Sequence, residues 1–260
     1  MSARCLVRAP SSRLAEGLVT HLERVPVDLD LARRQWRGYV DALEAQCWTA
    51  LEIEPLDEAP DGVFVEDALV MFDELGVITR PGALERRIET VSLRDALDGL
   101  GVEHVTLAAP ARLDGGDVLK VGRTAYVGLG GRTDRAGIAA LAALIEPRGW
   151  TVRAVPVAKA LHLKSAVTAL PDGTVIGHAP LVEDPSGFPR FLPVPEPDGA
   201  HVVVLDERRV LMAASAPRTA ELLAGRGLDI VTVDIGEFEK LEGCVTCLSV
   251  RLRGEPSRSP

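Results

Sequence analysis

The pattern that decides the fold is clearest in residues 117–155, which read DVLKVGRTAYVGLGGRTDRAGIAALAALIEPRGWTVRAV. Two short apolar runs come first, an Ala- and Leu-rich stretch at 136–145 follows, and a third apolar run at 151–155 ends the unit. Short runs rich in β-branched and aromatic residues are typical of strands, and Ala-rich stretches are typical of helices. The unit therefore predicts a strand, a strand, a helix and a strand, in that order.

The same succession recurs along the chain. One copy begins at Asp67 and ends with the apolar run at 102–107, and another covers residues 202–233. An Arg-Thr pair stands between the second strand and the helix in two of the copies, at 132–133 and at 218–219. Repeats of about 40 to 50 residues indicate units that stack around a common centre.

Two further units are less regular. One begins at Ser165 and has a Pro-rich loop at 180–197 where the others have a helix. The last is divided between the termini, with its first strand near Cys247 and the rest, including a helix at 31–45, near the N-terminus. Pairing of the terminal strands would close a ring. We therefore predict a five-bladed α/β propeller of ββαβ-type repeats with pseudo-fivefold symmetry, in which a small-molecule site lies on the central axis.

Composition places the chain among ordinary globular proteins. Its 260 residues, of which 47% are hydrophobic and 26% charged, can bury a large core as one domain or two. The closed ring favours one, so we predict a single α/β-propeller catalytic domain over residues 1–254 with a flexible tail at 255–260. No apolar run reaches the roughly 18 residues of a membrane span, and no signal peptide is evident, so we expect a cytoplasmic protein without a membrane partner. A net charge of −9 argues against nucleic acid as a partner and permits a cationic substrate. The sequence leaves a homodimer open.

Residues capable of catalysis stand at the openings of several units. Glu66 and Asp67 follow a short apolar run, and Asp114 precedes two glycines that allow close approach of the backbone to a ligand. Each acidic run taken alone is as well explained by a solvated turn, and His162 alone is more typical of a satisfied core histidine. Their equivalent positions in the repeat, together with Cys247, instead predict one shared site containing a possible thiol nucleophile and its base.

The cysteines Cys244 and Cys247 also form a C-x-x-C pair, within a stretch that we predict to be a strand because of its β-branched residues. Residues three apart on a strand face opposite sides, and neither a second C-x-x-C nor a suitably spaced histidine follows. A redox or zinc role is therefore disfavoured. Four cysteines in a chain of this length are too few for a disulfide scaffold.

Five motifs carry a family resemblance, and together they are specific. They are Phe-Val-Glu-Asp at 64–67, Ile-Thr-Arg-Pro-Gly-Ala at 78–83, Leu-Asp-Gly-Gly-Asp at 113–117, Leu-His-Leu-Lys at 161–164 and Glu-Gly-Cys-Val-Thr-Cys at 242–247. The chain resembles the dimethylarginine dimethylaminohydrolases of the guanidino-group-modifying (pentein) superfamily from about residue 6 to 252. The resemblance implies the same propeller and hydrolysis of N-omega-methylated L-arginine to L-citrulline and a methylamine, without metal or organic cofactor.

The resemblance also implies roles at the reacting end of the substrate. Cys247 would be the nucleophile and His162 the general acid and base. Asp114 would orient the guanidinium together with Glu66 and Asp67. These residue types suit the task, because carboxylates hold the N–H groups of a planar guanidinium in a fork and a thiolate can both attack and leave. A Cys-linked thiouronium intermediate would form, and His162 would then activate water.

The amino-acid end of the substrate would be held by a second set of residues. Arg86 and Arg132 match a pair that grips the substrate carboxylate, which arginines bind bidentately. Asp61 and the backbone carbonyls of Leu18 and Leu241 match the groups around the substrate amine, with Leu18 on a flexible lid.

Other functions remain open at this stage. Arginine deiminases perform the same chemistry on unmethylated arginine but typically carry an extra helical insertion, for which this chain has no room. Agmatine deiminase is less favoured, because agmatine lacks a carboxylate for the two arginines. From a different class, the same fold occurs in a ribosome-binding anti-association factor that has neither the catalytic cysteine nor the histidine.

Overall fold

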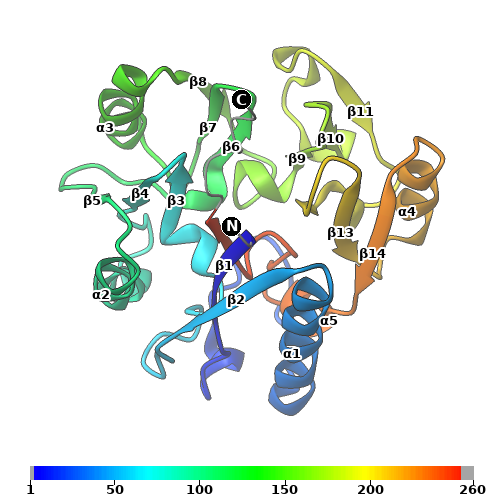
Figure 1. The fold of residues 1–260 in the computed structure, drawn as a ribbon, viewed down its shortest axis with the longest axis horizontal. Coiled ribbons are helices and arrows are strands. Elements are labelled where there is room, and N and C mark those ends of the chain that lie inside the picture. The colour runs from blue at the N-terminus through cyan, green and yellow to red at the C-terminus, as the bar shows by residue number, and fades with distance from the viewer. Residues whose placement is uncertain (1–2, 253–260) are drawn as a thin grey trace, which may run out of the picture.

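Five three-stranded sheets surround a central axis in the computed structural model, which describes residues 3–252 (Figure 1). Their orders are β15-β1-β2, β3-β4-β5, β6-β7-β8, β9-β10-β11 and β12-β13-β14. In every sheet the middle strand pairs antiparallel with the inner strand and parallel with the outer one. The predicted five-bladed propeller of ββαβ repeats is confirmed. The predicted tail at 255–260 lies outside the described residues.

The strands are short, and their bounds follow the chain in order. They are β1 (Ala3–Arg8), β2 (Trp48–Ile53), β3 (Leu69–Phe72), β4 (Leu75–Ile78), β5 (His104–Thr106), β6 (Val118–Val121), β7 (Thr124–Leu129), β8 (Thr151–Pro156), β9 (Val167–Ala169), β10 (Val175–Gly177), β11 (Phe191–Pro193), β12 (Val202–Val204), β13 (Arg209–Ala213), β14 (Asp229–Val233) and β15 (Val250–Leu252). Strands β3 and β4 are buried at every residue, which explains why they read as continuous apolar runs rather than alternating ones.

Four helices connect the middle and outer strands on the outside of the ring (Figure 1). They are α1 (Leu29–Ala45), α2 (Val91–Gly99), α3 (Arg135–Ile145) and α4 (Pro217–Ala224), and a short α5 (Gly236–Glu239) follows β14. Asp28 and Asp134 cap α1 and α3 by accepting from the backbone amides of Leu31 and Gly137. Two 3₁₀ turns replace the helix between β10 and β11, as the Pro-rich loop predicts. Within residues 3–252, none of the helices is both long and apolar enough to cross a membrane.

The ring is closed by strands from both ends of the chain. Strand β15 pairs antiparallel with β1, with Leu6 opposite Val250, and the inner strand β3 of the next blade contacts β15. The inner strands therefore converge on the axis, and the segments that lead into them meet there.

Candidate active site

The candidate catalytic residues lie in short turns that lead into the inner strands. The 3₁₀ turns Val65–Asp67, Gly115–Asp117 and Leu163–Ser165 precede β3, β6 and β9, respectively. A turn over residues 245–248 precedes β15. Four of the five blades thus deliver polar side chains to the axis from irregular backbone, just before the chain becomes a strand.

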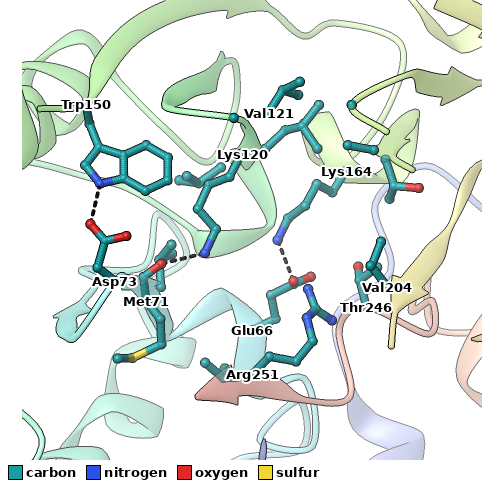
Figure 2. A pocket seen from close by; sticks show the side chains of 18 of the residues that line it. Glu66, Met71, Asp73, Lys120, Val121, Trp150, Lys164, Val204, Thr246 and Arg251 are labelled. Atoms are coloured by element: carbon teal, nitrogen blue, oxygen red, sulfur yellow. Dashed lines mark hydrogen bonds and ion pairs between the residues drawn. The ribbon is translucent and has the colours of Figure 1, made fainter. Parts of the chain in front are cut away.

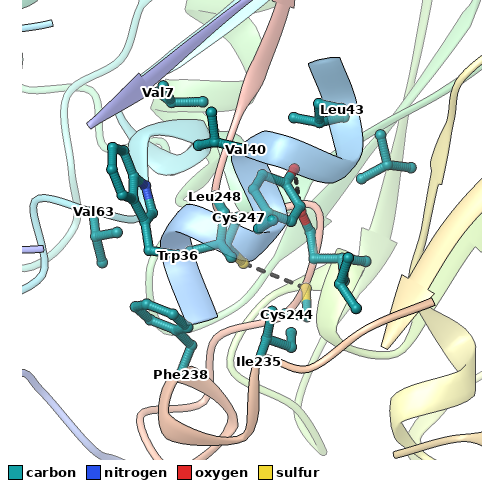
Figure 3. Close-up of a cluster of buried hydrophobic side chains, with 14 of the residues drawn as sticks. Val7, Trp36, Val40, Leu43, Val63, Ile235, Phe238, Cys244, Cys247 and Leu248 are labelled. Atoms are coloured by element: carbon teal, nitrogen blue, oxygen red, sulfur yellow. Dashed lines mark hydrogen bonds between the residues drawn. The ribbon is translucent and has the colours of Figure 1, made fainter. Parts of the chain in front are cut away.

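The predicted strand around Cys247 is wrong. The chain turns there, with the amide of Cys247 donating to the carbonyl of Cys244 at 3.0 Å, and the strand begins only at Val250. The turn brings the sulfur atoms of the two cysteines to 3.4 Å, so the expectation that they face opposite sides is also wrong (Figure 3). The amide of Glu66 donates to the carbonyl of Cys247 at 3.3 Å, which joins this turn to the neighbouring blade.

His162 is buried between two carboxylates. Its Nε2 lies 2.9 Å from Oδ2 of Asp114, and its Nδ1 lies 3.7 Å from Oδ1 of Asp67. Burial by itself would lower the pKa of His162, but the charge of Asp67, the hydrogen bond to Asp114 and the charge of Asp117 outweigh it and raise that pKa to about 9. The imidazole is therefore protonated at neutral pH.

Asp67 contacts several groups of the site at once, namely Arg86, His162 and the amide of Gly116. It lies 2.5 Å from Nη1 of Arg86 and accepts from the amide of Gly116 at 3.0 Å. Burial opposes its ionisation, but His162 and Arg86 outweigh burial and lower the pKa of Asp67 to about 2. A side chain at position 116 would place its Cβ 2.5 Å from Oδ1 of Asp67 and 2.7 Å from Nδ1 of His162, so glycine here lets the backbone pass close to these two side chains.

Arg86 and Arg132 differ in how many of their guanidinium N–H groups already have a partner in the protein. Arg86 binds both oxygens of Glu89, at 2.7 and 2.8 Å, in addition to Asp67. Arg132 makes one longer ion pair, 3.6 Å from its Nη1 to Oδ2 of Asp114, and this buried Nη1 has no hydrogen-bond partner among the described residues. Arg132 is therefore the arginine with a donor to offer to a ligand.

Eight of the ten predicted site residues line one small cavity. They are Leu18, Asp61, Asp67, Arg86, Arg132, His162, Leu241 and Cys247, and Phe64, Leu161, Glu242 and Gly243 complete the wall. The cavity volume is about 20 Å³, which has room for about one water molecule. An arginine side chain cannot enter without movement of the wall, so the structure shows the site in a closed form.

Leu18 in the wall of the cavity begins a segment, 18–22, whose backbone amides are bound by two acidic side chains. The amide of Leu18 donates to both oxygens of Asp61, at 3.0 and 3.2 Å. The amides of Thr20, His21 and Leu22 all donate to the carboxylate of Glu242. Sequence reasoning identified Asp61 but missed Glu242, whose only signal is its place beside the cysteine motif.

Glu66 and Asp114 do not line this cavity. A 3₁₀ turn rotates by about 120° per residue, so Glu66 points away from its neighbour Asp67. Its Oε1 instead lies 2.5 Å from Nζ of Lys164. Asp114 is fully buried behind His162, and its second oxygen accepts from the amide of Gly82 at 2.7 Å. Asp114 therefore contacts His162 and does not line the cavity.

The Glu66–Lys164 ion pair belongs to a second and larger cavity, of about 840 Å³, on the other side of the same turns (Figure 2). Thr246 and Arg251 also line it, and Thr246 is the chain neighbour of Cys247. Glu66 and Thr246 therefore line the larger cavity, whereas their chain neighbours Asp67 and Cys247 line the closed site.

Two further buried acids support the site and were missed as functional residues. Burial raises the pKa of Glu89 to about 7, although its ion pair with Arg86 opposes this. Burial likewise raises the pKa of Asp117 to about 6, although this carboxylate accepts from Thr133 at 2.6 Å and from the amide of Leu163 at 2.9 Å. The spacing of three residues between Arg86 and Glu89 is the one signal that could have identified such a pair.

Asp67, Asp114 and His162 offer three ligand atoms within 4.8 Å of one another, as a metal site requires. These atoms are already matched by charge, because the protonated His162 lies between the two carboxylates and Arg86 and Arg132 flank them. The two carboxylates are therefore already paired with cationic groups of the protein.

Comparisons with known proteins show which enzymes the whole chain is similar to. No protein-family model matches the chain. The chain is 64% identical over 252 residues to the N(G),N(G)-dimethylarginine dimethylaminohydrolase of Streptomyces coelicolor, covering 97% of this chain and 98% of the relative. It is 33% identical to the enzyme of the same name from Pseudomonas aeruginosa, over 96% of this chain and 100% of the relative. A cysteine-to-serine mutant of the Pseudomonas aeruginosa enzyme has been solved in complex with citrulline. This structure matches the present one with a TM-score of 0.89 at 30% identity, covering 96% of this chain and 99% of that one.

Proposed function

The chain belongs to the dimethylarginine dimethylaminohydrolase family, and from this premise we propose that it hydrolyses N-omega-methylated L-arginine to L-citrulline and a methylamine. The observation that carries the proposal is the closed cavity itself. A thiol, an imidazolium, a carboxylate and two arginines line one space, namely Cys247, His162, Asp67, Arg86 and Arg132. This set matches the nucleophile, acid, guanidinium acceptor and carboxylate donors that the reaction needs.

The substrate would enter with its guanidinium toward Asp67. A carboxylate with a pKa of about 2 is ionised throughout the physiological range, so it accepts the N–H groups of the guanidinium and fixes the plane of its central carbon. The substrate carboxylate would bind Arg132, whose buried Nη1 has a donor to offer. Arg86 would keep Asp67 in place and add a second contact only by releasing part of its bond to Glu89.

Attack on the guanidinium carbon would come from Cys247. The contact with Cys244, burial and the charges of Asp67 and Glu66 raise the pKa of Cys247 well above its usual value in the empty site. A bound guanidinium adds a positive charge beside the sulfur and favours the thiolate. The substrate therefore increases the thiolate fraction of its own nucleophile, and the proton of the thiol leaves to solvent, because His162 is already protonated.

His162 would donate the proton that the leaving amine needs. Its pKa of about 9 makes it an imidazolium at neutral pH, ready to act first as an acid. When the C–N bond breaks, methylamine or dimethylamine leaves and the carbon remains bonded to sulfur as a thiouronium. The neutral imidazole then takes a proton from water, whose oxygen attacks the same carbon and releases Cys247 and citrulline.

A direct test is to incubate the pure protein with arginine, monomethylarginine, asymmetric dimethylarginine and agmatine and to measure the ureido product. We expect turnover of the methylated arginines above that of the other two. Preferential turnover of arginine would indicate a deiminase instead, and no turnover of any compound would favour a binding protein. Cys247→Ser should abolish product, and His162→Gly should leave a covalent adduct detectable by mass spectrometry.

A further inference from the structure

We propose that Cys244 and Cys247 form a reversible disulfide when hydrogen peroxide enters the active-site cavity, so that Cys244 protects the nucleophilic sulfur from irreversible oxidation. Loss and recovery of activity through this bond rest on the proposed function of Cys247, whereas formation of the bond does not. Cys244 is otherwise a residue that the hydrolytic mechanism leaves unused.

The geometry of the turn already holds the two sulfur atoms together. They lie 3.4 Å apart, and the hydrogen bond from the amide of Cys247 to the carbonyl of Cys244 closes a four-residue turn between them (Figure 3). The ends of such a turn have Cα atoms less than about 7 Å apart, which is within the range that a disulfide spans. Side-chain rotation therefore has to close a gap of only about 1.4 Å to reach the roughly 2.05 Å of an S–S bond.

The two cysteines differ in what they face. Both cysteines are buried in the cluster that includes Ile235 and Phe238, but Cys247 also lines the cavity and Cys244 does not (Figure 3). The cavity of about 20 Å³ is close to the size of a water molecule, and hydrogen peroxide is only slightly larger than water. A small oxidant that enters by the substrate route would therefore meet the sulfur of Cys247 first, with that of Cys244 directly behind it.

The surroundings of Cys244 suit a sulfur that attacks its neighbour. Its Sγ contacts the hydroxyl of Thr246 at 3.4 Å as well as Cys247. The hydrogen bond with Cys247, and further the charge of His201 and the bonds from Thr246, lower the pKa of Cys244 well below its usual value. A thiolate at Cys244 is the form that can displace an oxygen from an oxidised Cys247.

The reaction balances with hydrogen peroxide as the two-electron oxidant. The fraction of Cys247 that has lost its proton attacks one peroxide oxygen as the thiolate, the O–O bond breaks, and hydroxide leaves as the sulfur becomes a sulfenic acid. The thiolate of Cys244 then attacks this sulfur, the S–O bond breaks, and a second hydroxide leaves as the S–S bond forms. With the two protons of the original thiols, the products are one disulfide and two water molecules. A dithiol such as dithiothreitol reverses the oxidation and restores both thiols.

The sequence around the pair allows a direct measurement on the natural chain. Trypsin cleaves after Lys240 and Arg251, so both cysteines fall in the single peptide 241–251, while Cys5 and Cys47 fall in other peptides. After limited peroxide treatment and blocking of free thiols, we expect this peptide to be about 2 Da lighter than its reduced form and to carry no blocking group, because two hydrogens are lost. Dithiothreitol should restore both the mass and the enzymatic activity.

Variants separate a resolving cysteine from a bystander. In Cys244→Ser and Cys244→Ala the sulfenic acid has no partner, so peptide 241–251 should gain about 32 Da as a sulfinic acid, and the activity that dithiothreitol recovers should fall about tenfold relative to the natural chain. Recovery is compared with each protein's own untreated rate. Cys47→Ser removes an exposed thiol outside the site and should behave as the natural chain does.

Distinct results overturn the two proposals. A natural chain that hydrolyses methylarginine but whose peptide 241–251 shows only oxygen addition under peroxide would overturn the disulfide and leave the proposed function standing. A chain without hydrolytic activity that still forms the disulfide would overturn the function and leave the redox pair standing. Equal recovery of the natural chain and both Cys244 variants would also refute the protective role.

Discussion

Replacing Asp114 with asparagine should lower the pKa of His162 and shift the pH dependence of catalysis. Asp114 presents one oxygen to Nε2 of His162 at 2.9 Å and the other to the amide of Gly82 at 2.7 Å. Asparagine has the same shape and can still accept from Gly82, but its amide nitrogen would then face the imidazole. Two N–H donors would oppose each other if His162 stayed protonated, whereas the neutral imidazole could accept a hydrogen bond.

The size of the effect follows from the interaction that is lost. A hydrogen bond to a charged group contributes about 1.5–3 kcal/mol, and about 1.4 kcal/mol corresponds to one pH unit in a pKa. Asp67 and Asp117 still favour the charged imidazole in the variant. The pKa of His162 should therefore fall from about 9 by about one to two pH units, to between about 7 and 8.

The direction of the shift in the pH profile follows from the role of protonated His162. Since His162 acts first as an acid, activity should decline as the pH rises through its pKa, and the alkaline limb of kcat/KM should move to lower pH in Asp114→Asn. The same group stabilises the fold below the unfolded pKa of about 6.5, and this contribution is lost as the pH rises toward about 9. The variant should therefore lose this stability at lower pH than the natural chain does.

Two measurements decide the matter. The imidazole of His162 can be titrated by NMR, with its signal assigned by comparison with His162→Gln, and the pH profile of kcat/KM gives the functional readout. Asp114→Glu keeps the negative charge and serves as the matched control, in which the pKa of His162 should stay near its value in the natural chain. A folded Asp114→Asn protein whose imidazole still titrates near 9 would refute the assignment of Asp114 as the residue that holds His162 protonated.

Three further predictions concern the ion pairs and hydrogen bonds of other charged residues in or beside the site. Arg86→Met should reduce the free energy of unfolding by about 3–5 kcal/mol in urea, because two buried carboxylates lose their partner, whereas Arg132→Met should leave stability nearly unchanged and raise KM about 10- to 100-fold. Equal destabilisation by the two changes would contradict this division. Glu242→Gln should weaken the bonds to the amides at 20–22 and speed hydrogen exchange there several-fold, and unchanged exchange would rule out its role in holding the closed segment. Lys164→Met should cost about 3–5 kcal/mol by leaving Glu66 buried without its partner, and the double variant with Glu66→Gln should recover most of that loss; no recovery in the double variant would argue against the pair.

Much of the fold could be predicted because it is encoded locally. The succession of apolar runs and helical stretches sets each blade, and its repetition sets their number, without reference to distant residues. The Pro-rich loop at 180–197 identified the blade that lacks a helix for the same reason. The strand predicted at Cys247 is a turn, because Val245 packs in the core and Thr246 lines the larger cavity, while strand pairing starts only at Val250.

The sequence by itself determined which residue types this protein brings to its axis, since acids, a histidine and a cysteine stand at equivalent points of the repeat. Only the tertiary structure decided which atoms meet. It turned Glu66 away from Asp67 toward Lys164, set Asp114 behind the histidine, and placed the sulfur atom of Cys244 3.4 Å from that of Cys247. The physical reason is that a side chain in a 3₁₀ or β-turn takes its direction from the local rotation of the backbone, and its partner from the packing of blades far apart in the chain. Neither the direction of a side chain in a turn nor its partner from a distant blade produces a repeating pattern in the sequence.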